Sequence, residues 1–251
     1  MPVFKEEMIS TERIRKKTGL SFFFLFLFFA ACFFGWKWLH HQPQDNGALK
    51  PLRTVLNANE KIFSSLVDDD HLAKTFPVNK AVSKVRVNGN AGMNADFDPL
   101  SWKLQLIRRA GDTLHISLDE IKALPKTDIV FDFKCIEGWS QVTHWAGVKF
   151  SDFVKRYGLI DQTGMQYAGL ITPDKGYYVG IDMSSILHPQ TILCYEMNGK
   201  PLPMNQGAPL RLIIPVKYGI KHLKRIGTIF FSNTRPPDYW YERGYDYFSG
   251  L

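Results

Sequence analysis

The most reactive side chain in the middle of the sequence is a cysteine that follows a predicted strand. Residues 129–133 are Ile-Val-Phe-Asp-Phe, a β-branched and aromatic run that predicts a short strand. Cys135 follows where this strand turns into a loop that contains Glu137, Gly138 and Trp139. A thiol at such a position is a candidate nucleophile or metal ligand. The alternative is a small buried hydrophobe, which is what most free cysteines are.

A second group of chemically useful side chains lies later in the sequence. Six basic residues gather there: Arg211, Lys217, Lys221, His222, Lys224 and Arg225. Such a cluster is either an ordinary solvated face or a binding site for an anionic group such as a phosphate. Glycines and prolines interleave with it, and on its own the cluster does not decide between the two interpretations.

Together, the two regions resemble the sulfite oxidase-like molybdopterin-dependent oxidoreductases. The first matching block is Cys135-Ile136-Glu137-Gly138-Trp139-Ser140, followed by Trp145-x-Gly147. The second matching block is Gly207-x-Pro209-x-Arg211, followed by Lys217-Tyr218-Gly219-Ile220-Lys221-x-x-Lys224. The resemblance extends over roughly Val82 to the C-terminus. It implies an α+β fold, a sulfite oxidase-type domain with mixed β-sheets that binds Mo-molybdopterin.

The resemblance also implies roles for individual residues. Cys135 would be the catalytic residue and the protein ligand of the metal, because molybdenum on a pterin dithiolene takes soft sulfur ligands and holds a thiol deprotonated. The implied cofactor-binding residues are Asn88, Cys135, Thr172, Gln206, Arg211, His222, Leu223 and Lys224. Gln206 stands where related enzymes have Asn or His. Asn88 lies closer to Cys135 in sequence than its counterpart in the reductase branch.

Two further observations bear on the reaction. His144 is a candidate acid near Cys135, but a satisfied structural histidine is the favoured interpretation because the sequence fixes neither its position nor its partner. The sulfite-oxidising branch has arginines soon after the cysteine, whereas this chain has Trp139, Ser140 and Gln141. An anion would meet fewer positive charges there. The resemblance therefore favours the branch of the periplasmic methionine sulfoxide reductase catalytic subunits.

The N-terminal region predicts a membrane anchor. Residues 20–39 are almost wholly apolar and include eight phenylalanines between Phe22 and Phe34, and Trp36 and Trp38 would form an aromatic belt at one end. The basic residues before this segment place the N-terminus in the cytoplasm and the following domain on the periplasmic side of the cytoplasmic membrane. A cleaved signal peptide is the alternative, and residues 29–32 faintly resemble a lipoprotein cleavage site.

The basic cluster at residues 13–17, Arg-Ile-Arg-Lys-Lys, has no adjacent arginine pair of the kind used for twin-arginine export of folded cofactor proteins. Either Arg15-Lys16 is a weak substitute, or the location, the cofactor loading or the family assignment is wrong.

The hydrophobic patterns divide the chain into four parts. These are a cytoplasmic basic tail (1–19), a transmembrane anchor (20–39), a linker with a short helix (40–80) and an oxidoreductase domain (81–251). The expected strands are residues 85–87, 102–107, 129–133, 167–172, 191–197, 211–215 and 227–232. The expected helices are residues 60–67, 117–124 and 150–157, with a solvated acidic run at 68–70. Many short strands in no regular alternation with helices indicate an α+β domain.

Composition limits the remaining classes of function. The 251 residues carry a net charge of +7 and suffice for one substantial core. Lys and Arg are scattered and no nucleic-acid-binding motif is present, so nucleic acid is not an expected partner. The three cysteines, at 32, 135 and 194, have no zinc spacing and allow at most one disulfide outside the apolar segment.

These observations predict a membrane-anchored, molybdopterin-dependent oxidoreductase that performs a two-electron redox step or oxygen-atom transfer. Its partners would be a small-molecule substrate, the membrane, and a membrane or haem protein for electron transfer. The alternative is a non-catalytic, membrane-anchored binding module on the same fold. A third hypothesis is an envelope protein whose Trp and Tyr residues only form a core and a partner face.

Overall fold

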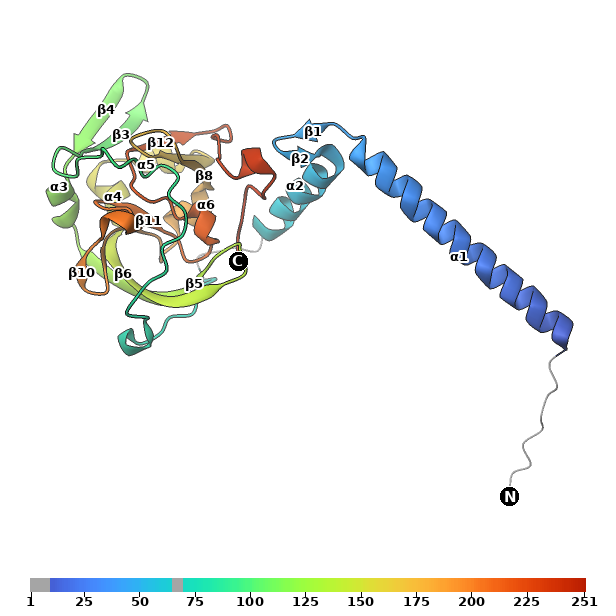
Figure 1. Ribbon diagram of the computed structural model, residues 1–251. Coiled ribbons are helices and arrows are strands. Elements are labelled where there is room, and N and C mark those ends of the chain that lie inside the picture. The colour runs from blue at the N-terminus through green and yellow to red at the C-terminus, as the bar shows by residue number, and fades with distance from the viewer. Residues whose placement is uncertain (1–9, 65–69) are drawn as a thin grey trace.

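A long N-terminal helix stands apart from the rest of the chain in the computed structural model, which describes residues 10–64 and 70–251 (Figure 1). Helix α1 (Thr11–His40) has 30 residues, none of them buried. Its N-cap Ser10 accepts a hydrogen bond from the backbone N–H of Arg13. At about 1.5 Å per residue the helix exceeds the roughly 30 Å of a bilayer core. With a mean hydropathy of 2.1 in its most apolar stretch, it is able to cross a membrane by length and composition.

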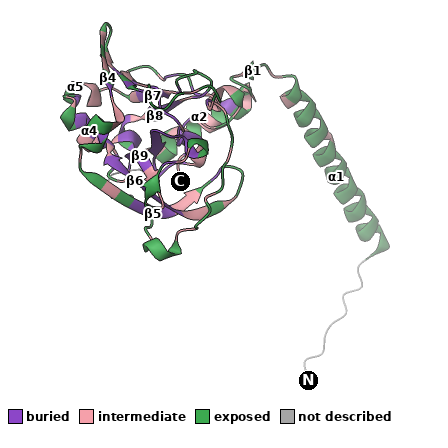
Figure 2. Cartoon of the chain, turned by 60° about the vertical axis from the view of Figure 1, so that its left-hand side comes forward, coloured by how far each residue is buried: buried purple, intermediate pink, exposed green. Residues whose placement is uncertain are grey.

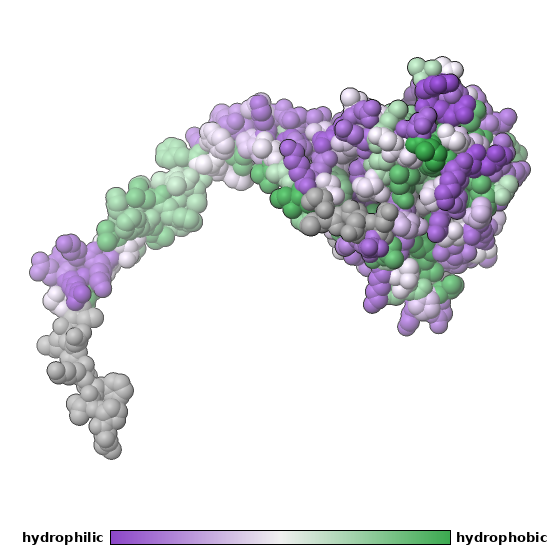
Figure 3. Space-filling view, turned by 180° about the vertical axis from the view of Figure 1, so that it is seen from behind, coloured by the Kyte–Doolittle hydropathy of each residue, from purple (hydrophilic) through white to green (hydrophobic). Residues whose placement is uncertain are grey.

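The apolar band occupies the middle of α1, and the described N-terminal end of the helix is hydrophilic (Figure 3). Residues 1–9 of the predicted basic tail (1–19) lie outside the described residues. Its remainder, from Thr11, continues the helix.

Two short strands and a second helix connect α1 to the body: β1 (Gln44–Asp45), β2 (Ala48–Leu49) and α2 (Lys50–Ser64). The segment predicted as a linker with a short helix (40–80) therefore holds a hairpin and a helix that begins at Lys50, ten residues before the predicted helix at 60–67. Gly47 adopts a φ of 77° in the hairpin turn, and Pro51 lies in the first turn of α2, where its missing N–H costs no helical hydrogen bond. Residues 65–67 of the predicted helix and 68–69 of the acidic run lie outside the described residues.

One five-stranded sheet carries the segment around Cys135. Its strands are β5 (Lys126–Lys134), β6 (Ser140–Lys149), β9 (Ile192–Met197), β10 (Lys200–Pro201) and β11 (Arg211–Ile213). The order is β10-β9-β6-β5, β11 also pairs with β9, and every pairing is antiparallel. The sequence prediction missed β6. Because β6 follows β5 so closely, Cys135 lies in the tip of a β-hairpin, and no long loop follows it.

The second five-stranded sheet is mixed. Its strands are β3 (Leu104–Arg109), β4 (Asp112–Ile116), β7 (Tyr167–Ile171), β8 (Tyr178–Asp182) and β12 (Thr228–Ser232). They follow the order β4-β3-β12-β7-β8, and β12 runs parallel to β3 while the other pairs are antiparallel. The predicted α+β class with mixed sheets is confirmed. Strands β4 and β8 were not predicted, and residues 85–87, predicted as a strand, form none.

Short helices fill the connections: α3 (Leu118–Lys122), α4 (Phe150–Arg156), α5 (Ile160–Thr163) and α6 (Met183–Leu187). Single 3-10 turns occur at η1 (Val78–Lys80), η2 (Met204–Gln206), η3 (Gly219–Lys221) and η4 (Tyr241–Arg243). A capping box is present at the start of α3, where the side chains of Ser117 and Glu120 each accept from the other's backbone N–H.

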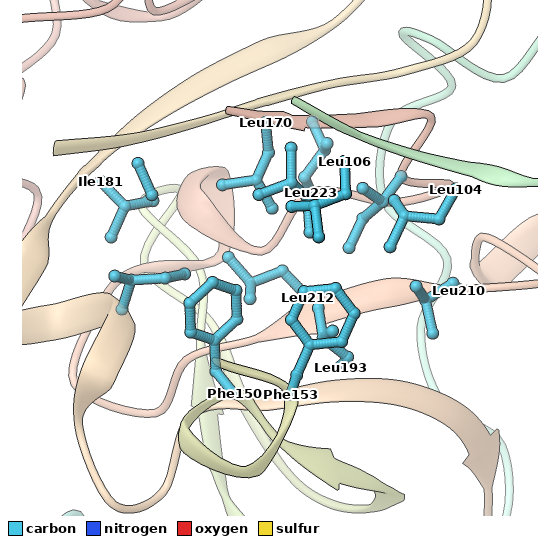
Figure 4. Close-up of a cluster of buried hydrophobic side chains, with 14 of the residues drawn as sticks. Leu104, Leu106, Phe150, Phe153, Leu170, Ile181, Leu193, Leu210, Leu212 and Leu223 are labelled. Atoms are coloured by element: carbon cyan, nitrogen blue, oxygen red, sulfur yellow. The ribbon is translucent and has the colours of Figure 1, made fainter. Parts of the chain in front are cut away.

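The main hydrophobic core lies between the two sheets, where buried residues concentrate (Figure 2). Leu106 and Leu170 from the mixed sheet face Phe150 and Phe153 of α4, with Leu212 between them (Figure 4). Each large apolar side chain buried in this way contributes about 1.5–3 kcal/mol.

A smaller cluster, which includes Phe131, Trp145, Cys194 and Ile213, covers the opposite face of the antiparallel sheet. Successive residues of a strand point to opposite faces. Both faces of this sheet are therefore packed, and the second face also forms the wall of the pocket described below.

Candidate cofactor site

Cys135 is held in the tip of the β5–β6 hairpin. The last register pair of the hairpin is Lys134 with Ser140, and residues 135–139 form the connection. The backbone N–H of Cys135 donates to the carbonyl of Trp139 at 2.9 Å, and the N–H of Gly138 donates to the carbonyl of Cys135 at 3.0 Å. Gly138 has a φ of 88°, a conformation that favours glycine. The tip is thus a closed turn that fixes the direction of the thiol.

The Cys135 thiol points into the protein and is only 5% exposed. The side-chain amide of Asn88 donates to its Sγ at 3.3 Å. Burial raises the pKa of the Cys135 thiol above its usual value, and the hydrogen bond from Asn88 acts in the opposite direction. The thiol is therefore protonated near neutral pH unless a cation beside it stabilises the thiolate.

A pocket with about 930 Å³ of empty space, partly open to solvent, lies over the second face of the antiparallel sheet. Strand periodicity explains its wall, because alternate residues of each strand share a face. The wall residues contributed by β5, the hairpin tip, β6 and β11 are Phe133, Cys135, Gln141, Thr143, Trp145 and Arg211. Loops supply the remaining sides through Arg86, Asn88, Gln206, His222, Lys224, Trp240 and Tyr245.

Arg211 is the most deeply buried cation of the pocket, at 2% exposure. Its guanidinium lies over the ring of Trp145, 4.6 Å from the centroid, and its Nη1 donates to the backbone and side-chain oxygens of Gln206 at 3.0 Å each. Its Nε is buried and has no hydrogen-bond partner in the described part of the chain. Burial lowers the pKa of Arg211 to about 10, so the side chain still carries its charge at neutral pH.

Lys224 supplies a second cation to the pocket. Its Nζ donates to the backbone carbonyls of Asn88 and Gly89, with 3.0 Å to the latter, and so ties the loop that carries Asn88 to the region around Arg211. Burial, and then the neighbouring charge of Arg211, lowers the pKa of Lys224 to about 8. Gly207 permits this arrangement, because a Cβ at its φ of 102° would lie 2.8 Å from the Cβ of Lys224.

His222 lines the pocket as a neutral ring. Its Nδ1 accepts from the backbone N–H of Ile214 at 3.4 Å, and its Nε2 lies 3.1 Å from the carbonyl of Lys217. Burial, with the charge of Arg211 as the second cause, lowers the pKa of His222 to about 3. The ring also packs edge-on against Phe133, 4.7 Å between centroids. His222 therefore adds no positive charge, contrary to its place in the predicted basic cluster.

The other members of the basic cluster are turned away from the pocket. Lys217 forms an ion pair with Asp182 at 2.7 Å, and Lys221 forms one with Asp238. Arg225 donates to the carbonyls of Ala208 and Asn94 and stacks on Phe97. The prediction of one dense anion-binding cluster was therefore too broad, since only Arg211 and Lys224 of these cations line the pocket.

Of the eight predicted cofactor-binding residues, the structure brings six to the pocket: Asn88, Cys135, Gln206, Arg211, His222 and Lys224. Thr172 lies outside it, where its hydroxyl donates to Asp174 at 2.6 Å and holds the turn after β7. Leu223 is fully buried in the main core, with its carbonyl accepting from Leu212. His144 is on the other face of β6 and contacts Asp128 at 2.8 Å, which fits the structural interpretation.

Sequence reasoning missed several wall residues. Arg86 stacks its guanidinium on Trp139, 4.8 Å from the ring centroid, and so brings a cation to the place where the sequence indicated few positive charges. Trp240 and Tyr245 come from the C-terminal segment, and Tyr177 donates to the carbonyl of Ile220 at 2.6 Å. No spacing in the sequence marks these residues, because each reaches the pocket through a tertiary contact.

The pocket's donors suit an anionic group that carries a soft metal. In the described chain, residues 10–64 and 70–251, no Asp or Glu forms an ion pair with Arg211 or Lys224. Buried charges ordinarily have a partner of opposite sign. A bound anion would therefore supply the partner that the two cations and the Nε of Arg211 lack. The Cys135 thiol offers sulfur to a soft metal such as molybdenum in the same space. These residues fit a molybdopterin.

Comparison with known proteins gives a consistent result. The family model described as "oxidoreductase molybdopterin binding domain" matches residues 90–240. A protein of Azospira oryzae, YedZ1, named for a proposed role as a protein-methionine-sulfoxide reductase subunit, is 33% identical over 208 residues, which cover 82% of this chain and 78% of that protein.

Protein-methionine-sulfoxide reductase catalytic subunits MsrP are also similar. The Xanthomonas campestris protein is 30% identical over 60% of this chain and 52% of its own length, and the Campylobacter jejuni protein is 29% identical over 69% and 63%. The chain thus spans less than two thirds of these two relatives. Among solved structures, the sulfane dehydrogenase SoxCD of Paracoccus pantotrophus aligns with a TM-score of 0.49 and 14% identity over 56% of this chain and 40% of that chain.

Proposed function

The chain belongs to the family of oxidoreductases with a molybdopterin-binding domain, and we propose that Cys135 is the protein ligand of its molybdenum. Family membership makes the protein a molybdenum cofactor-dependent oxidoreductase. The observation that carries the ligand assignment is the position of the buried Cys135 thiol in one pocket with two cations that lack carboxylate partners in the described chain. When bound, the cofactor supplies the metal centre for a two-electron step.

The residues of this chain then have separate tasks. Asn88 donates to Sγ of Cys135 and so orients the sulfur. Arg211 and Lys224 place positive charge beside the anionic pterin, where charge-assisted hydrogen bonds are strongest. Trp139 and Trp145 form aromatic walls that limit the access of water. Proton donation to the substrate is left to solvent at the open mouth, since His222 is neutral with both ring nitrogens engaged.

A sulfoxide is the substrate class that we infer. The relatives named above are methionine-sulfoxide reductases. The mouth of the pocket is apolar and aromatic, with Ile136, Trp139, Trp240 and Tyr245, and its charges, Arg86 and Glu137, have opposite sign. Such a surface suits a neutral thioether oxide better than a sulfite anion. The reaction would take two electrons and two protons, release the sulfoxide oxygen as water and leave a thioether. The electrons would come from a membrane or haem protein.

Helix α1 would anchor this enzyme as a single-pass protein in the cytoplasmic membrane, with the catalytic domain on the periplasmic side. Its length and apolar band support the span, and Arg13, Arg15, Lys16 and Lys17 at its N-terminal end support the orientation. Protease added to spheroplasts should digest the domain that carries Cys135. A catalytic domain that is protected until the cells are lysed would contradict this orientation.

The experiment that tests the function is metal and pterin analysis of the protein purified from its own host, combined with a sulfoxide reduction assay. Near-stoichiometric molybdenum and turnover are expected. Cys135→Ser should fall below about one hundredth of wild-type turnover, because a serine oxygen is a harder ligand than a thiolate. Cys194→Ser is the matched control, since Cys194 is buried outside the pocket and donates to the carbonyl of Glu196.

Equal turnover of the Cys135→Ser and Cys194→Ser proteins would reject the ligand assignment. Bound pterin without turnover on any sulfoxide would favour the alternative of a binding module on the same fold.

A further inference from the structure

Helix α2 is held against the body through polar contacts. Arg53, the only fully buried residue of this helix, is 1% exposed, and its guanidinium lies 4.0 Å from the ring centroid of Tyr241. It donates to four backbone carbonyls: those of Asp45 at 3.4 Å, Asn46 at 2.7 Å, Tyr241 at 2.8 Å and Tyr245 at 2.8 Å. Two turns further on, Glu60 accepts two hydrogen bonds from Arg235, at 2.8 and 2.7 Å.

One exposed side of α2 carries an apolar stripe. Leu52, Val55 and Phe63 are 47%, 57% and 53% exposed, and at about 100° per residue their positions fall within about 80° of one another, roughly a quarter turn from Arg53 and Glu60. A helix on a water-soluble body normally turns its apolar stripe inward and its charges outward. In α2 the apolar stripe is exposed and lies beside the polar contacts with the body, so it is available to a partner other than the body.

We propose that the outward stripe of α2, formed by Leu52, Val55 and Phe63, lies in the headgroup region of the lipid bilayer that α1 crosses. This inference rests on the proposed membrane anchor. Three observations select lipid as the occupant. The stripe begins only a short hairpin after α1 ends at His40, so it cannot be far from the membrane surface. The chain turns at the hairpin, and α2 runs across the line of α1 without continuing it (Figure 1).

The third observation is the aromatic end of α1. Trp36 and Trp38, at the end of α1, are 64% and 59% exposed and have the composition of an interfacial belt. In the space-filling view, hydrophobic surface reappears beyond α1 on the lower side of the segment that joins it to the body (Figure 3).

Docking of α2 also sets the pocket relative to the membrane. The carbonyl of Tyr245 accepts from Arg53, and the residues Trp240 and Tyr245 line the pocket. The wall of the pocket is therefore one hydrogen bond away from the helix on the lipid surface. Substrates and electron donors would approach a mouth held next to the membrane, and the anchor would be more than a tether.

The test is photo-crosslinking of the full chain reconstituted in vesicles of phosphatidylethanolamine with phosphatidylglycerol as the minor anionic lipid. Benzoylphenylalanine replaces Val55 or Phe63 on the stripe, and Thr54, exposed on the polar side of α2, is the matched control. Phe26 in the middle of α1 reports on the anchor. All four side chains are exposed, so the replacements leave the packing of the body intact. Lipid adducts are measured by mass spectrometry.

Lipid adducts at Val55 and Phe63 that exceed those at Thr54 by about tenfold are the expected result. Adducts at Phe26 with no excess at Val55 and Phe63 would overturn the docking of α2 and leave the anchor in place. Adducts to protein in place of lipid at the stripe would also overturn it. Failure at Phe26 as well would reject the anchor itself, and with it the inference.

Discussion

Four basic residues of one stretch, residues 211–224, form two pairs with different partners. Lys217 and Lys221 are buried, whereas the other pair joins the buried Arg211 to the half-buried Lys224. Lys217 and Lys221 are each 1% exposed and each contacts a carboxylate: Asp182 at 2.7 Å for the first and Asp238 for the second. Arg211 and Lys224 face the pocket and donate only to neutral oxygens. The sequence shows six basic residues within positions 211–225, and the fold makes two of them a structural pair and two a binding pair.

The difference shows how a binding cation is recognised. A buried charge with its counterion in the protein contributes to the fold, and removal of one partner leaves the other uncompensated. A buried charge that has only dipoles around it is destabilising until a ligand supplies the counterion. Burial lowers the pKa of Lys217 and that of Lys224 to about 8 each, so these two values do not separate the pairs. The difference is in the partner, because Lys217 has the carboxylate of Asp182, whose pKa is lowered to about 2.

The largest effect that the comparison predicts is on stability. Lys221→Met leaves the carboxylate of Asp238, 2% exposed, without its cation and should lower the free energy of unfolding by about 3–5 kcal/mol. Arg211→Met leaves only the neutral oxygens of Gln206 without a donor and should cost about 1–2 kcal/mol. Urea unfolding of the cofactor-free proteins measures both values.

Adding Asp238→Asn to Lys221→Met should restore part of the loss, because the remaining charge is removed. An equal loss of unfolding free energy in Lys221→Met and Arg211→Met would contradict the distinction between the two pairs.

The next effect is on the cofactor. Arg211→Met together with Lys224→Met removes two charge-assisted contacts, each of about 1.5–3 kcal/mol, so the protein should purify largely free of pterin. Fluorescence of the released and oxidised pterin, per mole of folded protein, measures this loss. Lys217→Met is the control from the structural pair, and it should destabilise the protein while the folded fraction retains its pterin. Unchanged pterin in the double variant would make the pocket cations a structural feature.

The smallest effect is a pH dependence of cofactor retention. In the free pocket the pKa of Lys224 is lowered from 10.5 to about 8, and a bound anion would raise it again. The complex therefore keeps a proton that the free pocket loses above pH 8. Lys224 contributes fully to cofactor binding below that pH. The affinity for the cofactor falls as the pH rises toward 10.5, by at most about tenfold per pH unit. Lys224→Arg stays charged and should flatten the curve.

Pterin retained after dialysis across this pH window measures the effect in both proteins. Parallel curves for wild type and Lys224→Arg would exclude Lys224 as the titrating group, since the contribution of Lys217 is common to both.

The sequence was sufficient where chemistry and strand periodicity coincide. The pattern at residues 129–133 predicted β5, and the two motif blocks named Cys135, Arg211 and Lys224, which the fold brings to one pocket. Alternation along β5, β6 and β11 explains the wall formed by the sheet, because odd-numbered positions such as Phe133, Thr143 and Arg211 share the pocket face. Cys135 reaches the pocket through the hairpin tip and Lys224 through a loop. Once β6 is recognised, the same rule places His144 on the opposite face.

Other features depend on tertiary contacts that the sequence does not encode locally. Which lysine faces the pocket is decided by the 3-10 turn at Gly219–Lys221 and by Arg225 at a φ of 51°. Thr172 and Leu223 were placed at the cofactor by resemblance, yet a turn and the main core occupy their side chains. Residues 50–59 of helix α2 were predicted as part of a linker because Pro51 and several polar residues are typical of linkers, and only residues 60–64 fell within the predicted helix.

The contacts of Arg53 also impose an order on the synthesis and folding of the chain. Two of its four acceptors, the carbonyls of Tyr241 and Tyr245, lie 188 and 192 positions later in the chain and do not exist until those positions have been translated. Closing so long a loop carries an entropic cost that grows with the logarithm of its length. While the ribosome is still at work, α1 is already made and α2 is undocked. The contacts of Arg53 with Tyr241 and Tyr245 can therefore form only after the pocket residues Trp240 and Tyr245 have been synthesised or are being synthesised with them.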